Sequence, residues 1–284
     1  MVEEKKLKNW TQSYWNQVSR NIGIINIEDQ EILRKANIAI FGLGGLGGPL
    51  AEQLVRSGCE NLLICDNDQF EPSNLNRQIC TRNDLGKYKV DIMERFLKSI
   101  NPELNLNKVI NVNKKNIKEK LSNISIVALT LDDPIGSILI ARECSKNKIP
   151  MIESWAIPYL CAWWFTSDSI DYETCYGLNT HNLEIQDIEK SDEAIKNIKN
   201  AFFLKLIKFP EIKKRYDREK NSINQLLSQE IPSISLAPIV RLNASYLAYE
   251  IIFSGILKIK QMVKAPKVVG YDYLKMKSFE FNFN

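Results

Sequence analysis

Apolar and polar segments alternate along the first half of the chain, and this alternation predicts an α/β fold. Short apolar runs are separated by longer amphipathic stretches, which is the pattern of strands joined by helices. Such βαβ units are right-handed and build a mainly parallel, doubly wound sheet with helices on both faces. The expected strands are 37–41, 61–66, 107–112, 124–129 and 150–154, and the expected helices are 48–57, 87–100 and 135–147.

The second half of the chain has a different pattern. A run at 160–166 predicts a strand that leads into an antiparallel extension. Residues 183–230 are polar and rich in Lys, Glu and Asn, with apolar residues at helical spacing, which predicts a helical insertion. The insertion either lies over the functional site or is a solvated excursion without a role in the chemistry. An apolar helix at 238–259 and a final strand at 268–276 complete the prediction.

Composition and charge argue against a role on nucleic acid or in a membrane. The 38 Lys and Arg residues exceed the 34 Asp and Glu residues only slightly, for a net charge of +4, and they are spread along the chain, so we expect no nucleic-acid partner. No apolar run reaches the roughly 18 residues of a membrane span, and the first residues lack the hydrophobic region of a secretory signal. We therefore expect a cytoplasmic protein without membrane contacts.

A glycine-rich turn of the form G-x-G-x-x-G directly follows the first apolar strand. It contains Gly42, Gly44, Gly45 and Gly47, and Asp66 follows at the end of the next apolar run. A glycine turn at a helix N-terminus leaves backbone N–H groups free to bind phosphates, and an acid about 20 residues further on can hold a ribose hydroxyl. The pattern predicts a nucleotide site in a Rossmann-like fold, and taken alone it would suit NAD or FAD equally well.

Cationic and amide side chains follow that acid and change the picture. Asn74, Arg77 and Gln78 form the pattern N-L-x-R-Q, and Lys89 ends the pattern G-x-x-K. Hydride transfer needs no fixed cation here, whereas an Arg and a Lys suit an enzyme that neutralises a triphosphate and its leaving pyrophosphate. Lys87, two residues before Lys89, is expected to face solvent.

The order of these motifs resembles the E1-like adenylyltransferases, the superfamily of ThiF, MoeB and the ubiquitin-activating enzymes. Members carry G-x-G-G-L-G, D-x-D, N-L-x-R-Q, G-x-x-K and a catalytic Asp in this order, and all five occur here. The resemblance implies a single domain over 1–284. It would consist of a helical arm at 1–35, a nucleotide-binding core at 36–155 and a substrate-side extension at 156–284 that contains the helical insertion.

The resemblance also assigns roles to residues. Arg77 and Lys89 would hold the triphosphate, and Asp132 would bind Mg²⁺ and place the α-phosphate. Arg20 would cross a homodimer interface to the neighbour's ATP. Asp68 matches the second acid of D-x-D, and we expect it to support the loop that presents the N-L-x-R-Q residues.

Three positions depart from the family pattern. Asn21 stands where the family has Gln, Asp133 where it often has Asn, and Ser137 where it often has Arg. Asp133 is therefore a second candidate for holding the metal.

Cysteine usage predicts no zinc site. Many members bind zinc through two C-x-x-C pairs, but here Cys175 keeps only the first member of one pair and the last 50 residues contain no Cys. Members that form thioesters or persulfides use a cysteine in a mobile loop, and 179–235 has none. We expect Cys175 to be structural and the lone His181 to be an ordinary loop residue.

Four aromatic side chains follow the fifth strand, where the family places its acyl substrate. They either stack on a planar substrate or belong to the core. They are Trp155, Tyr159, Trp163 and Trp164.

The function implied by the resemblance is Mg²⁺-dependent acyl-adenylate formation from ATP and a substrate carboxylate. That carboxylate is either the C-terminal Gly of a ubiquitin-like sulfur carrier or a small cofactor precursor, such as the pyridinol of the iron-guanylylpyridinol cofactor. Two other classes stay open: an NAD-dependent Rossmann oxidoreductase and a nucleotide-binding scaffold without catalysis. The oxidoreductase would leave Arg77 and Lys89 without a purpose.

Overall fold

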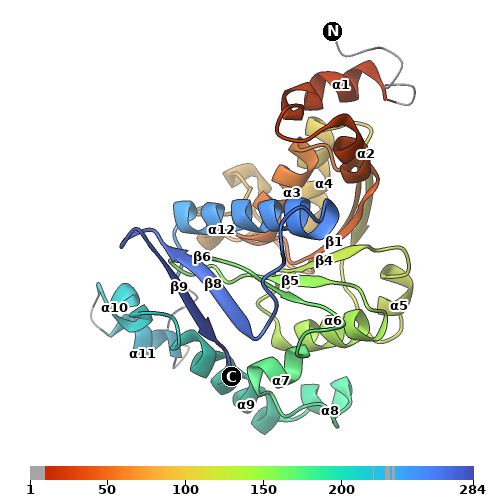
Figure 1. Cartoon of the computed structure of the whole chain (residues 1–284). Coiled ribbons are helices and arrows are strands. Elements are labelled where there is room, and N and C mark those ends of the chain that lie inside the picture. The colour runs from red at the N-terminus through yellow and green to blue at the C-terminus, as the bar shows by residue number, and fades with distance from the viewer. Residues whose placement is uncertain (1–9, 220, 228–230, 232–233) are drawn as a thin grey trace.

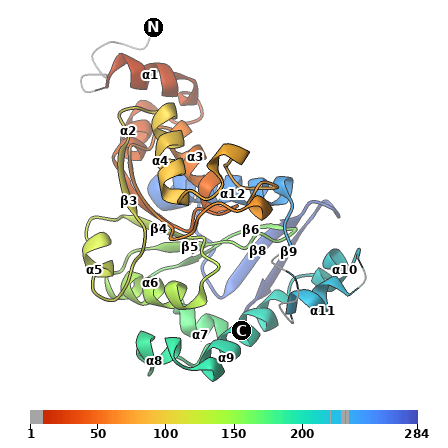
Figure 2. The same ribbon diagram turned by 180° about the vertical axis from the view of Figure 1, so that it is seen from behind.

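The centre of the protein is a six-stranded sheet with helices on both faces (Figures 1 and 2). The computed structural model describes residues 10–219, 221–227, 231 and 234–284. The strand order is β3-β2-β1-β4-β5-β7, in which β1 to β5 are parallel and β7 is antiparallel to β5. The predicted doubly wound, mainly parallel sheet with an antiparallel extension is confirmed. The strands of this sheet are β1 (Asn37–Phe41), β2 (Asn61–Cys65), β3 (Asn105–Val109), β4 (Ile126–Leu129), β5 (Met151–Glu153) and β7 (Trp163–Phe165).

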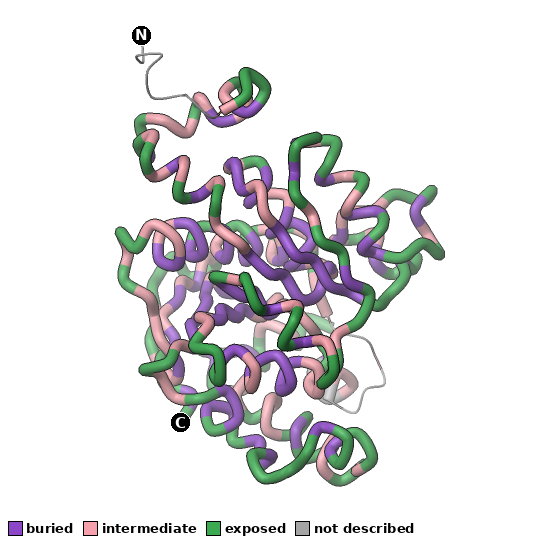
Figure 3. The backbone as a smooth tube through the Cα atoms, turned by 90° about the vertical axis from the view of Figure 1, so that its right-hand side faces the viewer, coloured by how far each residue is buried: buried purple, intermediate pink, exposed green. Residues whose placement is uncertain are grey.

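Alternate residues of β1, β2, β4, β5 and β7 enter two separate hydrophobic cores. On β1, Ile38 and Ile40 belong to one core, and Ala39 and Phe41 belong to the other. These strands are therefore buried on both faces, as the continuous apolar runs indicate, whereas β3 at the edge of the sheet is mostly exposed. Figure 3 shows the buried strands in the middle of the molecule and exposed segments around them.

The two cores are covered by different helices. Residues of α3, α4 and α12 build the first core, and residues of α5, α6 and α7 contribute to the second. The helices of the first face are α3 (Gly47–Arg56), α4 (Lys89–Ile100) and α12 (Ala237–Glu250), which continues as a π-helix (Ile251–Ile256). On the second face are α5 (Ile117–Lys120), α6 (Pro134–Lys146) and α7 (Tyr172–Tyr176).

The predicted strand at 160–166 is two short strands in different sheets. β6 (Leu160–Cys161) pairs with β8 (Lys267–Asp272), and β7 pairs with β5. The chain passes from one sheet to the other at Ala162, so the continuous apolar run does not correspond to one strand. The expected single strand was wrong at this point.

The expected final strand at 268–276 was also wrong, because the chain forms a hairpin there. β8 (Lys267–Asp272) pairs antiparallel with β9 (Lys277–Asn282), and together with β6 they form a second sheet. The turn between them carries Leu274 and Met276, which are exposed. These apolar turn residues gave the sequence the appearance of one longer strand.

Other predicted elements shift at their ends. The third strand lies two to three residues before the predicted 107–112, and regular α-helix in the predicted 238–259 segment ends at residue 250. The first helix after the glycine turn and the helix that ends before Asn101 lie where the sequence predicts them, within two residues.

Residues 183–230 contain helices, as predicted. The helices are α8 (Ile185–Glu189), α9 (Asp192–Leu206), α10 (Ile212–Tyr216) and α11 (Ser222–Leu227). Their apolar side chains pack into the second core, with Ile188, Ile198 and Phe209 buried. The insertion is thus part of the packed domain, and α8 and α9 lie beyond α6 and α7 in both views (Figures 1 and 2).

The N-terminal arm is helical in its described part. It contains α1 (Gln12–Val18), a 3₁₀ turn (Ser19–Asn21) and α2 (Ile27–Lys35). Tyr14 Oη donates to Gly58 O at 2.8 Å, and Gln30 Nε2 donates to Ser57 O at 2.9 Å. These bonds fix the arm to the C-terminal end of α3. Residues 1–9 of the predicted arm lie outside the described residues.

The aromatic residues after β5 are mainly core. Tyr159, Trp163 and Trp164 are each 0% exposed, and Trp155 packs against the same core as Trp163. Trp163 and Trp164 enter opposite cores because neighbouring residues of a strand point to opposite faces. The prediction of stacking on a planar substrate therefore loses support.

Glu153, at the end of β5, is a carboxyl group buried within this aromatic cluster. Tyr176 Oη donates to Glu153 Oε2 at 2.5 Å, and Trp155 Nε1 donates to Oε1 at 3.2 Å. Burial raises the pKa of Glu153 from about 4.5 to about 7 despite these hydrogen bonds, which lower it. The folded protein therefore prefers the protonated carboxyl.

We expect this group to make stability fall as pH rises. The stabilising contribution of protonated Glu153 is complete below about pH 4.5 and is lost as the pH rises through about 7. Between pH 5 and pH 8 the loss is on the order of 2–3 kcal/mol. Glu153→Gln removes the titration, so urea unfolding should show a smaller fall in the free energy of unfolding for the variant than for wild type. Parallel pH profiles of the two proteins would contradict this assignment.

Candidate functional site

The chain segments that follow β1, β2 and β4 meet at one edge of the sheet. β1 lies between β2 and β4, so the strand order reverses direction beside it. Gly42 N donates to Cys65 O at 2.8 Å, and Thr130 N donates to Phe41 O at 2.9 Å. In open α/β sheets, ligands bind outside the carboxyl ends of the strands at such a reversal.

Two glycines of the turn are required by close backbone contacts. Gly42 has a φ of +95°, and a Cβ there would lie 2.5 Å from Thr130 O. A Cβ on Gly47 would lie 1.8 Å from Gly42 O. Thr130 Oγ1 also donates to Gly42 O at 2.8 Å, so the turn is closed against the end of β4.

The other two predicted glycines border more open space or flexible side chains. The nearest atom to a Cβ on Gly44 would be an amide nitrogen at 3.7 Å, and a Cβ on Gly45 would meet Val240 and the stem of Arg77. Helix α3 begins at residue 47, so its free N–H groups lie at this edge of the sheet.

Asp66 is fixed beside the turn. Its carboxylate accepts from Leu43 N at 2.6 Å and from Asp68 N at 2.9 Å, and the residue is 6% exposed. Burial raises the pKa of Asp66, while Lys89 Nζ at 4.0 Å and the two backbone donors lower it. The structure thus brings the predicted acid to the glycine turn.

Lys89 is the first residue of α4 and is almost completely buried. Its Nζ lies 2.7 Å from Asp68 Oδ2, and the residue is 6% exposed. Lys87 is exposed and donates to Asn83 O, as the sequence indicates. Asp68 was expected to support the N-L-x-R-Q loop, but its carboxylate binds Lys89.

The N-L-x-R-Q loop lies against the glycine turn. Asn74 Oδ1 accepts from Glu71 N at 3.1 Å, which holds the loop through a buried side chain. The aliphatic part of the Arg77 side chain lies along Gly45. Its guanidinium donates to Ser73 O at 3.1 Å and to the side-chain oxygen of Asn76. Arg77 is therefore beside the turn, with its guanidinium bound to its own loop.

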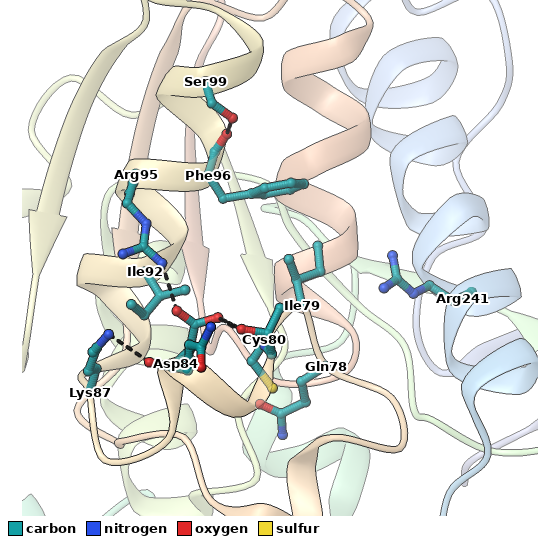
Figure 4. Close-up of a pocket in the computed structure, with 12 residues that line it drawn as sticks. Gln78, Ile79, Cys80, Asp84, Lys87, Ile92, Arg95, Phe96, Ser99 and Arg241 are labelled. Atoms are coloured by element: carbon teal, nitrogen blue, oxygen red, sulfur yellow. Dashed lines mark hydrogen bonds and ion pairs between the residues drawn. The ribbon is translucent and has the colours of Figure 1, made fainter.

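Gln78 connects the turn to a neighbouring groove of about 690 Å³ (Figure 4). Its side chain lies 3.7 Å from the position of a Cβ on Gly44, and among the described residues its buried Oε1 accepts no hydrogen bond. Ile79, Phe96 and Arg241 also line the groove, which runs from loop 78–84 towards α12. Gln78 is the only predicted site residue in its lining.

Asp132 lies two residues beyond Thr130 at the same edge and is exposed. Its carboxylate makes no hydrogen bond or ion pair within the described part of the chain. Asp133 is different, because its two carboxylate oxygens accept from Ile135 N at 3.0 Å and Gly136 N at 3.1 Å and cap helix α6. Ser137 Oγ donates to Asp133 O in the same turn.

Arg20 does not join this site within one chain. It is exposed, and its neighbour Asn21 donates to Ser57 O at 3.1 Å, just past the last residue of α3. Helix α3 starts at the glycine turn and has 10 residues, so it is about 15 Å long. Arg20 lies near the C-terminal end of this helix, and the site lies at its N-terminal end.

The cysteines and the histidine show no arrangement for catalysis or metal binding. The six cysteines are free thiols, and Cys175 is 0% exposed. Across 10–219, 221–227, 231 and 234–284, no group of three or more His, Cys, Asp or Glu side chains could hold a metal ion. His181 is a loop residue whose Nε2 lies 2.9 Å from Asp171 Oδ1. The absence of zinc stays a prediction.

Two contacts of the site were missed by sequence reasoning. Thr130 holds the glycine turn, and its only signal is that it is the first polar residue after an apolar strand. Val240 lies against Gly45 from a helix almost 200 residues away, and no local pattern indicates that contact.

The fold places this chain in the class of Rossmann-like α/β proteins with a glycine turn at the strand-order reversal. The ThiF family model matches residues 18–284, so the chain belongs to the ThiF family. The part of the chain that the structure describes has no helix with the length and apolar character needed to cross a membrane.

Curated relatives resemble about half of the chain. A tRNA threonylcarbamoyladenosine dehydratase of Bacillus subtilis (strain 168) is 32% identical over 142 residues, which cover 49% of this chain and 56% of that protein. A molybdopterin-synthase adenylyltransferase of Haemophilus influenzae is 33% identical over 139 residues, which cover 47% of this chain and 56% of that protein. The chain thus spans about half the length of the curated relatives it matches.

Solved structures match over nearly the whole chain. The structure of PaaA matches with a TM-score of 0.68 at 19% sequence identity. The alignment covers 98% of this chain and 85% of the PaaA chain. Escherichia coli MccB with MccA-N7isoAsn has a TM-score of 0.67 at 22% sequence identity. The alignment covers 97% of this chain and 73% of the MccB chain. At these identities the similarity shows the shared fold.

We predict that the glycine turn tolerates a methyl group at one position and not at another. Gly47→Ala should lower the free energy of unfolding by at least about 3 kcal/mol, because its Cβ would overlap Gly42 O. Gly44→Ala is the matched control and should change it by less than about 1 kcal/mol. Urea unfolding of the two variants measures this, and equal losses would show that backbone contact does not govern the turn.

Proposed function

We propose that this protein is an ATP-dependent adenylyltransferase that activates a substrate carboxylate. The observation that carries the proposal is the buried Lys89 ammonium beside the glycine turn and Asp66, at the carboxyl edge of the sheet. A nearly buried cation next to free helix N–H groups suits a polyphosphate. Membership of the ThiF family and the named adenylyltransferases among its relatives support this reading.

In the proposed reaction, a substrate carboxylate oxygen attacks the α-phosphorus of ATP. The bond from that phosphorus to the oxygen of the β-phosphate breaks, and pyrophosphate leaves with the electron pair. The products are an acyl-adenylate and pyrophosphate. No general base is needed, because a carboxylate is already ionised at neutral pH.

Each site residue has a proposed role in this reaction. The backbone at 42–47 would surround the phosphates and Asp66 would accept hydrogen bonds from the ribose. Lys89 and Arg77 would stabilise the charge that develops on the leaving pyrophosphate. Asn74 holds the loop of Arg77, and the amide oxygen of Gln78, at the edge of the turn, accepts no hydrogen bond from the described residues.

Asp132 fits a magnesium ion that arrives with the nucleotide. Mg²⁺ typically takes one or two carboxylates and completes its shell with phosphates and water. Asp132 offers one exposed carboxylate with no competing partner within the described residues, and Asp133 is committed to the helix cap. When bound, Mg²⁺ would add positive charge next to the phosphates.

The better-supported substrate is the carboxyl end of a polypeptide. Three of the four aromatic side chains that could stack on a small planar acid are 0% exposed, and Trp155 is half-buried against the same core. Relatives include a SAMP-activating enzyme E1, and the neighbouring MccB was crystallised with MccA. A carrier protein or peptide is therefore our first candidate, and a small cofactor-precursor carboxylate is the alternative.

ATP–pyrophosphate exchange tests the proposed function. We expect Mg²⁺-dependent exchange only when the right carboxylate is added, from a panel of carrier proteins, peptides and small acids. ATP binding without exchange for any of these would favour a nucleotide-binding scaffold. Binding of NAD in place of ATP would favour an oxidoreductase.

We predict different effects at the two adjacent aspartates. Asp132→Asn should lower exchange at least about 100-fold while ATP binding persists, since it removes the proposed metal ligand. Asp133→Asn keeps a capping acceptor for α6 and should retain exchange within about threefold. Equal losses in both variants would mean that both carboxylates hold the metal.

A mixing experiment tests whether Arg20 acts in a partner subunit. Arg20→Ala and Asp132→Asn should each be inactive alone. In a mixed dimer, one site would combine an intact Asp132 with the partner's intact arginine, so an equal mixture should recover about a quarter of wild-type exchange. No recovery after subunit exchange would contradict action across a homodimer.

A further inference from the structure

The ammonium of Lys89 has a carboxylate partner within the chain. Its Nζ lies 2.7 Å from Asp68 Oδ2 and 4.0 Å from Asp66 Oδ1. Lys89 is 6% exposed, and a buried ammonium without a partner carries a large desolvation cost. Asp68 therefore neutralises Lys89.

The backbone fixes this pair in place. Lys89 N donates to Asp68 O at 2.9 Å, Phe70 N donates to Lys87 O at 3.0 Å, and Gly86 N donates to Phe70 O at 2.9 Å. Segments 68–70 and 86–89 thus form a short antiparallel ribbon. A pair held by backbone on both sides has a defined geometry, unlike a surface ion pair between two flexible side chains.

The two acids of the D-x-D pattern have different freedom. Both oxygens of Asp66 accept a backbone N–H group, so this carboxylate is anchored. The Asp68 side chain is 58% exposed, and its hydrogen bond is to Lys89. Asp68 can turn to water without breaking a backbone contact, whereas Asp66 cannot.

We propose that Asp68 is a positioning residue, which holds the Lys89 ammonium beside the glycine turn and yields it to the phosphates when ATP binds. This inference rests on the proposed function. The phosphates and Asp68 compete for one ammonium, and the displaced carboxylate takes up water because it is already largely exposed.

The exchange of partners has opposite effects on binding and turnover. A carboxylate next to the phosphates repels them and competes for Lys89, so Asp68 weakens ATP binding. The same carboxylate fixes the start position of the ammonium, and misplaced charge stabilises a transition state poorly. If Asp68 were only structural, its replacement would lower ATP affinity and turnover together.

Asp68→Asn separates these effects, because it keeps a hydrogen-bond acceptor and removes the charge. We expect the dissociation constant for Mg·ATP, measured by calorimetry, to fall about fivefold. We expect kcat for pyrophosphate exchange to fall about tenfold. Thermal unfolding shows whether the variant is folded.

Asp91→Asn is the matched control. Asp91 also lies in the first turn of α4, but its carboxylate pairs with Lys108 at 2.8 Å. Its removal takes away one negative charge close to the same helix start, and both constants should stay within about twofold of wild type.

The outcomes distinguish the two proposals. Wild type that binds no ATP overturns the proposed function, and this inference with it. Wild type that binds ATP, together with an Asp68→Asn variant of equal or weaker affinity, overturns only the role of Asp68. An equal gain in affinity in Asp91→Asn would also overturn it, because the effect would then be general electrostatics.

Discussion

The candidate site depends on the close approach between the end of β1 and the segment after β4. Gly42 lies against Thr130 O, and Gly47 lies against Gly42 O, at distances that leave no room for a side chain. This contact sets where α3 begins and directs its free N–H groups to the edge of the sheet. Leu43 N, which belongs to the same turn, holds the carboxylate of Asp66. The glycines, the helix start and the acid are thus one hydrogen-bonded unit.

Local sequence pattern was sufficient for the parallel sheet and insufficient where the chain changes sheets. The strand at 37–41 lies where its apolar run predicts it, because residues on both of its faces are buried. At Ala162 one apolar run serves two sheets, and the hairpin after β8 exposes apolar residues in its turn. Both features depend on contacts between segments distant in the chain, which periodicity cannot report.

The motifs identified the residues of the site but not all their partners. The glycine pattern and the acid after it predicted that Gly42 and Asp66 would come together, the family resemblance added Lys89, and the structure brings all three to one edge. The pairing of Lys89 with Asp68 could not be read from sequence, since it depends on a ribbon between two loops. Arg20 matches its motif yet lies at the far end of α3, so its proposed role requires a second subunit.

We infer that this edge of the sheet binds a nucleoside triphosphate and that Lys89 moves from Asp68 to its phosphates. A structure of the protein with Mg²⁺ and a non-hydrolysable ATP analogue tests it most directly. We expect the triphosphate at the glycine turn, the ribose at Asp66, and Lys89 Nζ closer to a phosphate oxygen than to Asp68. A nucleotide bound elsewhere, for example in the groove beside Gln78 (Figure 4), or a Lys89 still paired with Asp68, would contradict it.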